Sequence, residues 1–155
     1  MNRSVPVVRI AALVVIMITA AMVYVRHQNQ ILLNACANGI DDPEAALVAC
    51  TEAQSAMVVP IPQHVSLIHR HRMRAYMLLG DAEGVLREVD LAIAADPTSE
   101  VPWQWKAWYF ARAENYQAAM VAIEAALKIA PENDYSIQMK RKLLLAMGSV
   151  DEVNG

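Results

Sequence analysis

The sequence predicts an all-α fold, in which an N-terminal transmembrane helix precedes a short solenoid of helix–turn–helix repeats with a C-terminal capping helix. Segments 67–97 and 101–131 correspond at a spacing of 34 residues, and each ends on a proline after an alanine-rich stretch. An uncharged apolar run precedes the repeats, and no alternating strand pattern competes with the helical periodicity. Repeats of this kind stack side by side and usually serve as scaffolds.

The leader, residues 1–26, is predicted to be a signal-anchor that stays in the protein. Residues Ile10–Val25 carry no charge, and the apolar stretch covers residues 7–25 if the Arg9 side chain snorkels to the interface. Such a stretch can cross a lipid hydrocarbon core of about 30 Å. The alternative is a secretory signal peptide that is removed near residues 19–21. The apolar run continues past that site, which favours retention.

Basic residues around the span predict its orientation. Arg3 and Arg9 precede the apolar stretch, whereas Arg26 and His27 follow it. Because the amino terminus adds to the charge of the two arginines, the positive-inside tendency places the repeats outside the cytoplasm.

Turn residues place the helices of the repeat domain. Gly39 closes one helix, and Asp42, Asp81 and Asn115 precede others as caps. The expected helices cover residues 27–38, 43–57, 64–79, 82–95, 100–113, 116–129 and 134–146, with a flexible tail at 148–155. Residues 7–38 contain neither glycine nor proline. The membrane helix therefore either continues into the first repeat helix or breaks at the polar residues 26–30.

The two cysteines, Cys36 and Cys50, both lie in the first predicted helix pair. Alignment of the second helices of successive units places Cys50 on the face that meets its partner helix, near whose end Cys36 lies. A disulfide closing this short loop would stabilise the domain by about 3 kcal/mol. The alternative is two buried, reduced thiols. A catalytic pair is disfavoured because the spacing is not that of a Cys-x-x-Cys motif.

The third unit resembles the tetratricopeptide repeat family, here of the membrane-anchored bacterial periplasmic type. It carries the residue types that this family uses at Trp103, Ala107, Phe110, Ala119, Ile123, Ala126 and Pro131. The second unit departs from the pattern at His69, Met73 and Val85, and we expect locally looser packing there. The resemblance covers residues 27–147 and implies repeats at 27–60, 64–97 and 98–131, followed by the capping helix at 134–146.

The resemblance also implies a concave groove, lined by the first helix of each repeat, for a peptide or a partner helix. Its inward-facing candidates are Leu67, Arg70, Arg74 and Met77 in one unit and Val101, Gln104, Trp108 and Arg112 in the next. Arginine binds carboxylates bidentately and tryptophan supplies contact area, so an acidic, partly apolar peptide or a C-terminal carboxylate would fit. In the alternative interpretation the arginines only solvate the surface, Trp103 belongs to the core, and Trp105 packs between units.

Other classes of function find little support in the sequence. His69 and His71 are two residues apart and point to different sides of a helix, so a basic helix face is favoured over a metal site that includes His64. The net charge of −3 disfavours nucleic acid as a partner. The sequence lacks a glycine-rich phosphate loop, a nucleophile elbow and an HExxH motif, and we expect no catalysis, cofactor or small-molecule substrate.

We therefore expect a non-catalytic scaffold in the bacterial inner membrane, with its repeats in the periplasm and a membrane-associated protein as partner. Its role would be that of an accessory subunit or assembly factor of an inner-membrane complex. The alternative is a periplasmic chaperone that captures peptides during the maturation of apocytochromes or other secreted chains. An enzyme or a metal-binding domain is a distant further alternative.

Overall fold

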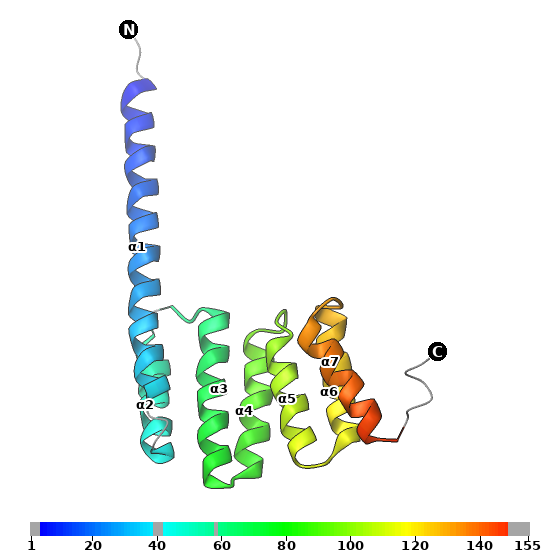
Figure 1. The fold of residues 1–155 in the computed structure, drawn as a ribbon. Helices are drawn as coiled ribbons and strands as arrows, with labels where there is room; N and C mark the ends of the chain where they lie inside the picture. The colour runs from blue at the N-terminus through cyan, green and yellow to red at the C-terminus, as the bar shows by residue number, and fades with distance from the viewer. Residues whose placement is uncertain (1–3, 39–41, 58, 149–155) are drawn as a thin grey trace.

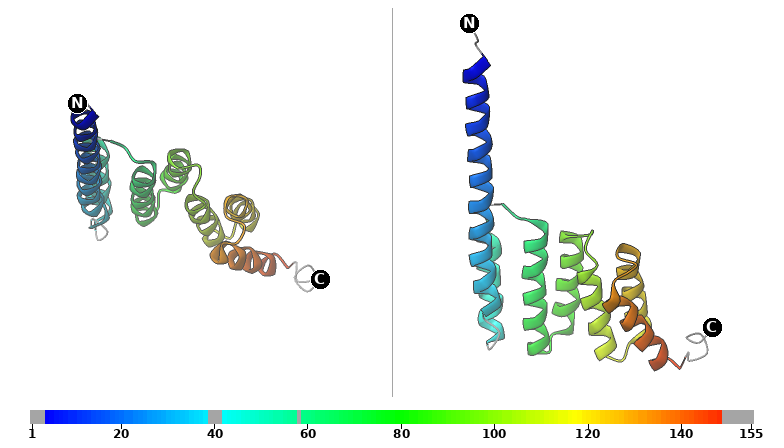
Figure 2. Two further views of the ribbon diagram at one scale, coloured as in Figure 1. Left: turned by 90° about the horizontal axis from the view of Figure 1, so that it is seen from above. Right: turned by 45° about the horizontal axis from the view of Figure 1, so that its top comes forward.

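The structure is a computed structural model that describes residues 4–38, 42–57 and 59–148, with side chains from residue 9 onward. These residues form seven α-helices and no strand, which confirms the predicted all-α fold. Figure 1 shows the helices in a row, and Figure 2 shows that the row curves when seen from above. In chain order they are α1 (Ser4–Asn38), α2 (Pro43–Ala56), α3 (Pro62–Leu79), α4 (Ala82–Ala95), α5 (Val101–Arg112), α6 (Tyr116–Ile129) and α7 (Asp134–Ala146).

The first helix is uninterrupted, so the separate helix expected at residues 27–38 is wrong, as is the break at residues 26–30. The polar stretch stays helical because Asn29 turns into the domain. Asn29 is only 1% exposed, and its side-chain Nδ2 donates a hydrogen bond of 2.9 Å to the Val59 carbonyl. Further along α1, Leu33 and Cys36 are buried in a cluster with residues of α2 and α3.

The N-terminal half of α1 projects beyond the other helices (Figure 1). Large apolar side chains such as Ile10, Met17 and Val23 are exposed there. By length and composition, α1 is the one helix among the described residues that could cross a membrane, over Arg9–Asn38. An N-terminal signal sequence meets the same criterion.

Short polar side chains fix the starts of four helices. Asp42, Asp81, Asn115 and Asn133 each accept a hydrogen bond from the backbone N–H three residues later, which satisfies a donor that the helix leaves unpaired. Prolines stand in the first turns of α2, α3 and α5, where a missing N–H costs nothing. Gly80 ends α3 in the left-handed conformation, with φ of 73°.

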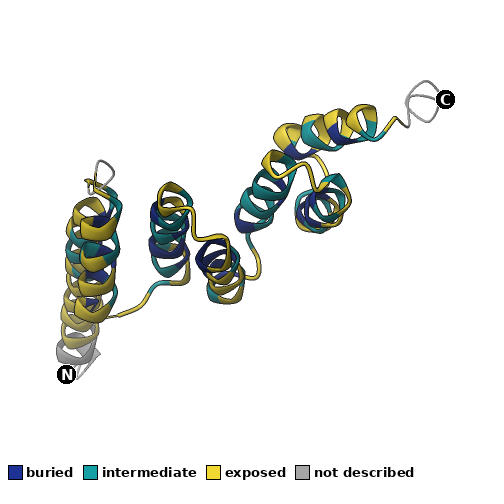
Figure 3. Ribbon diagram, turned by 90° about the horizontal axis from the view of Figure 1, so that it is seen from below, coloured by how far each residue is buried: buried dark blue, intermediate teal, exposed yellow. Residues whose placement is uncertain are grey.

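Three apolar clusters lie along the row, between neighbouring helices (Figure 3). Alanine dominates the cluster between α5 and α6, and small side chains let two helices approach closely. The α7 helix closes this cluster with Leu143, and a surface ion pair joins it to α6, with Lys140 Nζ 2.9 Å from Glu124 Oε1. The clusters contain Leu33, Cys36, Cys50, Ala53, Met57 and Ile68; Met73, Val85 and Val89; and Ala107, Ala119, Ala122, Ile123, Ala126 and Leu143.

Met73 and Val85, where looser packing was expected, are both covered by neighbouring residues, although Met73 also lines a hollow between α3 and α5. Both side chains are buried in the middle cluster, between α3 and α4. Gly84 supplies the close approach that a bulky Val85 would otherwise prevent, because a Cβ added at Gly84 would lie 2.5 Å from Tyr76 Cδ1. A glycine one position earlier therefore replaces the small residue that the family pattern has at Val85.

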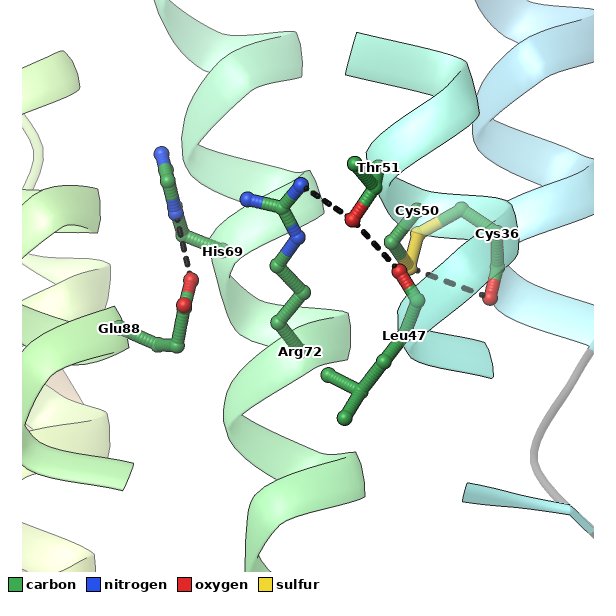
Figure 4. The surroundings of a disulfide bond; sticks show 7 residues. All are labelled: Cys36, Leu47, Cys50, Thr51, His69, Arg72 and Glu88. Atoms are coloured by element: carbon green, nitrogen blue, oxygen red, sulfur yellow. Dashed lines mark hydrogen bonds and ion pairs between the residues drawn. A yellow bond between two sulfur atoms is a disulfide. The ribbon is translucent and has the colours of Figure 1, made fainter. Parts of the chain in front are cut away.

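Two side-chain links lie on either side of α3 (Figure 4). Cys36 and Cys50 are buried and disulfide-bonded in the structure, with sulfur atoms 1.94 Å apart, and they join α1 to α2. His69 Nδ1 of α3 lies 2.8 Å from Glu88 Oε2 of α4, and both side chains are buried. His69 occupies a position where the family pattern has a large apolar residue, and Glu88 gives this buried polar group its partner.

Gly84→Ala is expected to destabilise the fold, although glycine to alanine in a helix usually stabilises by roughly 0.5–1 kcal/mol. The added methyl group would meet Tyr76 and the carboxylate of Asp81 at 2.5–2.6 Å. We expect a net loss of about 1–3 kcal/mol in thermal unfolding followed by circular dichroism in detergent micelles. Leu91→Ala, at an exposed position of the same helix, is the control and should change little. A higher melting temperature for Gly84→Ala would contradict the close contact.

Candidate functional site

A hollow of about 250 Å³ opens between α3 and α5. Arg70, Arg74 and Met77 follow one another at intervals of three or four residues, which sets them along one face of α3. The α5 helix contributes two tryptophans three residues apart. The full lining, here called the arginine–tryptophan hollow, is Arg70, His71, Met73, Arg74, Met77, Trp105 and Trp108.

Two arginines are held against the tryptophan rings. Arg70 Cζ lies 5.2 Å from the ring centroid of Trp105, and Arg112 Cζ lies 5.3 Å from that of Trp108. At these distances the ring attracts the cation, which limits the motion of the guanidinium group while its N–H groups can still bind a carboxylate.

The charge of the hollow is not balanced by nearby carboxylates. Within the described residues, no ion pair within 4.0 Å involves Arg70, Arg74 or Arg112, and the acidic partners of the observed pairs are Glu88, Asp90 and Glu124. The surface therefore offers positive charge next to two large aromatic rings. That combination suits an anionic group attached to an apolar one.

Burial lowers the pKa of His71 below its ordinary value of 6.5, and the positive charges of Arg70 and Arg74 lower it further. The imidazole is therefore neutral near pH 7. In this state His71 adds a polar, uncharged edge to the hollow, and it adds a third positive charge only in more acidic solution.

Most of the predicted groove residues meet at this hollow. Arg70, Arg74, Met77 and Trp108 line it, and Arg112 lies over the Trp108 ring. Sequence reasoning missed Trp105 as a lining residue. Trp105 packs on the middle cluster, as expected for a residue between units, and it also faces the hollow. Its spacing of three residues from Trp108 is the signal that could have identified it.

Gln104 was expected in the groove and is not among the residues that line this hollow. Its Nε2 donates hydrogen bonds to Asn133 Oδ1 at 3.1 Å and to Ser136 Oγ at 3.0 Å, which tie α5 to the start of α7. Leu67 packs against the first apolar cluster, and Val101 is the half-buried first residue of α5. Trp103 packs against the alanine-rich cluster, in agreement with its assignment to the core.

The histidines of the basic run occupy three different environments. His69 pairs with Glu88, His71 lines the hollow, and His64 lies nearer α1, where burial and then the charge of Arg26 lower its pKa. Across residues 4–38, 42–57 and 59–148, the structure contains no group of three or more His, Cys, Asp or Glu side chains arranged to hold a metal ion.

Folding is expected to weaken in mildly acidic solution because of His64 and His71. Their pKa values are lower in the folded chain, so the unfolded chain takes up protons first as the pH falls. Stability is therefore complete above about pH 7.5 and declines as the pH drops through roughly 6.5. The melting temperature, measured across this range, should depend less steeply on pH in His71→Gln than in wild type. His27→Gln, at an exposed position, is the control. An unaltered slope in His71→Gln would contradict the assignment.

Comparison with known proteins shows a likeness of fold. No family model matches the chain, and neither does any curated protein. Among solved structures it is similar to the first tetratricopeptide repeat domain of Spaghetti (RPAP3), bound to the HSP90 peptide SRMEEVD, at 15% sequence identity and a TM-score of 0.62. The match covers 79% of this chain and 97% of that chain. The helices thus form a tetratricopeptide-like fold, preceded by one long apolar helix.

Proposed function

We propose that this protein is a non-catalytic scaffold that binds an acidic, partly apolar segment of a partner protein at the arginine–tryptophan hollow. The observation that carries the proposal is the stacking of Arg70 on Trp105 and of Arg112 on Trp108 beside one hollow. Guanidinium groups recognise carboxylates through paired hydrogen bonds, and the rings supply apolar contact. The similar structure was solved with a peptide, SRMEEVD, that also carries acidic residues.

The size of the hollow favours a peptide over a small molecule. Pockets that enclose small molecules usually measure roughly 300–1,000 Å³, whereas this hollow measures about 250 Å³ and is open to solvent. It can receive one or two side chains of a longer segment. Neighbouring surface on α3 and α5 would then contact the rest of the peptide.

We further propose that α1 anchors the scaffold in a membrane. Its exposed apolar surface between Ile10 and Tyr24 is unfavourable in water and favourable in lipid. Arg3 and Arg9 favour an orientation with the repeats outside the cytoplasm, in the periplasm of a bacterial inner membrane. An oxidising compartment of this kind would also preserve the bond between Cys36 and Cys50.

Within this proposal the protein is an accessory subunit or assembly factor of an inner-membrane complex, with a membrane-associated partner. The continuity of α1 favours this role, because it holds the binding surface close to the bilayer. The alternative is a tethered chaperone for apocytochromes or other secreted chains. The shallow hollow favours that alternative, since few buried contacts give weak and exchangeable binding.

Peptide binding can be measured by the fluorescence anisotropy of a fluorescein-labelled SRMEEVD peptide added to the full-length protein in detergent micelles. Arg70→Ala and Arg74→Ala should each raise the Kd about tenfold, since each removes a charged hydrogen-bond donor. Added salt should weaken binding by wild type. The matched control is Arg87→Ala, which removes an arginine that lies over Tyr76 instead of at the hollow. Absence of binding by wild type, or an equal loss in Arg87→Ala, would contradict an acidic-peptide site.

A pull-down in mild detergent distinguishes the two roles. Wild type, Trp108→Ala and a chain lacking residues 1–26 would be compared by mass spectrometry of the bound proteins. A stoichiometric complex that is lost with the leader supports the subunit role. Substoichiometric partners that are lost only in Trp108→Ala support peptide capture, and the recovery of no protein partner by wild type would contradict the proposed scaffold.

A further inference from the structure

The segment between α2 and α3 carries an apolar surface that the scaffold does not use. Val59 and Ile61 lie beside α1, where they form a hollow of about 630 Å³ with residues of the apolar half of that helix. Apart from Arg26 at its edge, every residue that lines this hollow is apolar: Ile18, Ala21, Met22, Val23, Val25, Val59 and Ile61. A large apolar concavity next to an exposed apolar helix is unfavourable in water.

We propose that residues 59–62 are a second membrane contact, in which Val59 and Ile61 enter the interfacial layer of the bilayer and lipid acyl chains fill the hollow beside α1. This inference rests on the membrane span proposed above. The apolar face of the segment continues the apolar surface of α1, so one lipid environment would cover both. Arg26, at the edge of the hollow, would then lie at the level of the lipid headgroups.

Two backbone carbonyls of this segment are hydrogen-bonded within the protein. Pro60 and Pro62 carry no N–H group. The Val59 carbonyl accepts a hydrogen bond of 2.9 Å from Asn29 Nδ2, and the Ile61 carbonyl accepts bonds of 2.9 and 3.0 Å from the backbone N–H groups of His64 and Val65. Backbone polar groups that enter lipid must be satisfied within the protein, and these two carbonyls meet that requirement. Asn29 is therefore the positioning residue that holds the segment against α1.

The orientation of the helix row places this segment at the membrane side. Figure 1 shows the connections from α2 to α3, α4 to α5 and α6 to α7 at the same ends of the helices, on the side from which α1 projects. The second and third of these connections carry the half-buried Glu100 and the exposed Glu132. Acidic side chains favour water over lipid, so bilayer contact is confined to the apolar segment beside α1.

The lining of the hollow favours lipid over a transmembrane helix of a partner. Helices that pack together in membranes usually meet through small or polar residues, which permit close approach and interhelical hydrogen bonds. Here large side chains such as Ile18, Met22 and Val25 predominate, with Ala21 as the small residue. Flexible acyl chains fill such an irregular apolar surface without a matching partner.

The test uses a polarity-sensitive NBD dye on a single introduced cysteine in the full-length protein, reconstituted in phosphatidylcholine vesicles. Cys36 and Cys50 are bonded and buried, so the dye is directed to the new site. The labelled variants are Val59→Cys, Leu78→Cys as the matched control and Val15→Cys as the probe of the span. Val59 and Leu78 are 49% and 59% exposed and lie toward opposite ends of α3. Quenching by lipid spin-labelled near the headgroup is compared with quenching by aqueous iodide.

We expect the dye at position 59 to shift to the blue and to lose about half of its emission to the spin-labelled lipid, because the contact is shallow. The dye at position 78 should respond to iodide alone. Quenching of position 59 by iodide would overturn the inference, and so would protection of position 59 from both quenchers, which would mean that protein fills the hollow. Position 15 lies near the middle of the proposed span, so its quenching is measured with lipid spin-labelled deep in the acyl chain, and if it escaped this lipid the proposed span itself would fail. Lipid quenching at 15 without quenching at 59 would overturn this inference alone.

Discussion

The arrangement of the helices depends on α1, whose C-terminal half is packed in the protein and whose N-terminal half is exposed. In its C-terminal half, α1 packs Leu33 and Cys36 into the first apolar cluster and so supplies the first layer of the helix row. In its N-terminal half, the same helix exposes apolar side chains. Residues 7–38 of α1 contain neither glycine nor proline, so this part of the helix is stiff and the direction of its packed half sets the direction of its apolar half. Each following helix packs on its neighbour. This packing therefore fixes where the arginine–tryptophan hollow lies relative to the apolar half of α1.

The arginine–tryptophan hollow, where we propose that a peptide binds, arises from the way neighbouring helices share small and large residues. Alanines at the α5 and α6 contact and Gly84 at the α3 and α4 contact allow close approach. Large side chains do not fit at these close contacts. Trp105 and Trp108 of α5 lie instead where this helix faces α3, at the junction of the α3–α4 and α5–α6 pairs. Because arginines stack on these rings, the junction carries both charge and apolar surface. Packing of the fold and chemistry of the site thus share the same residues.

Repeat spacing and turn residues predicted the helices from α2 to α7, because each helix starts and ends on a local signal such as Asp81 or Gly80. The continuity of α1 could not be decided in this way. It involves a contact between Asn29 and Val59, which are 30 residues apart in the sequence. Asn29 is polar, so the local sequence around it indicates a break, whereas its side chain is buried in the structure. The hydrogen bonds of Gln104 could not be foreseen for a similar reason, since its partners Asn133 and Ser136 lie at the start of a helix outside the repeat pattern. Gly84 likewise provides the close approach of α3 and α4 that a small residue at Val85 would have given, and this depends on the contact of Gly84 with Tyr76 of α3.

In the structure, α1 connects its apolar half and the repeats as one unbroken helix. Hydrogen–deuterium exchange of the full-length protein in phosphatidylcholine nanodiscs tests it most directly, by comparing the amides of residues 26–30 with those of residues 32–36. Amides of a continuous, packed helix exchange only when the helix opens. We expect slow exchange across both stretches, without a step between them. Fast exchange at residues 26–30, between two protected stretches, would reveal a hinge and contradict it.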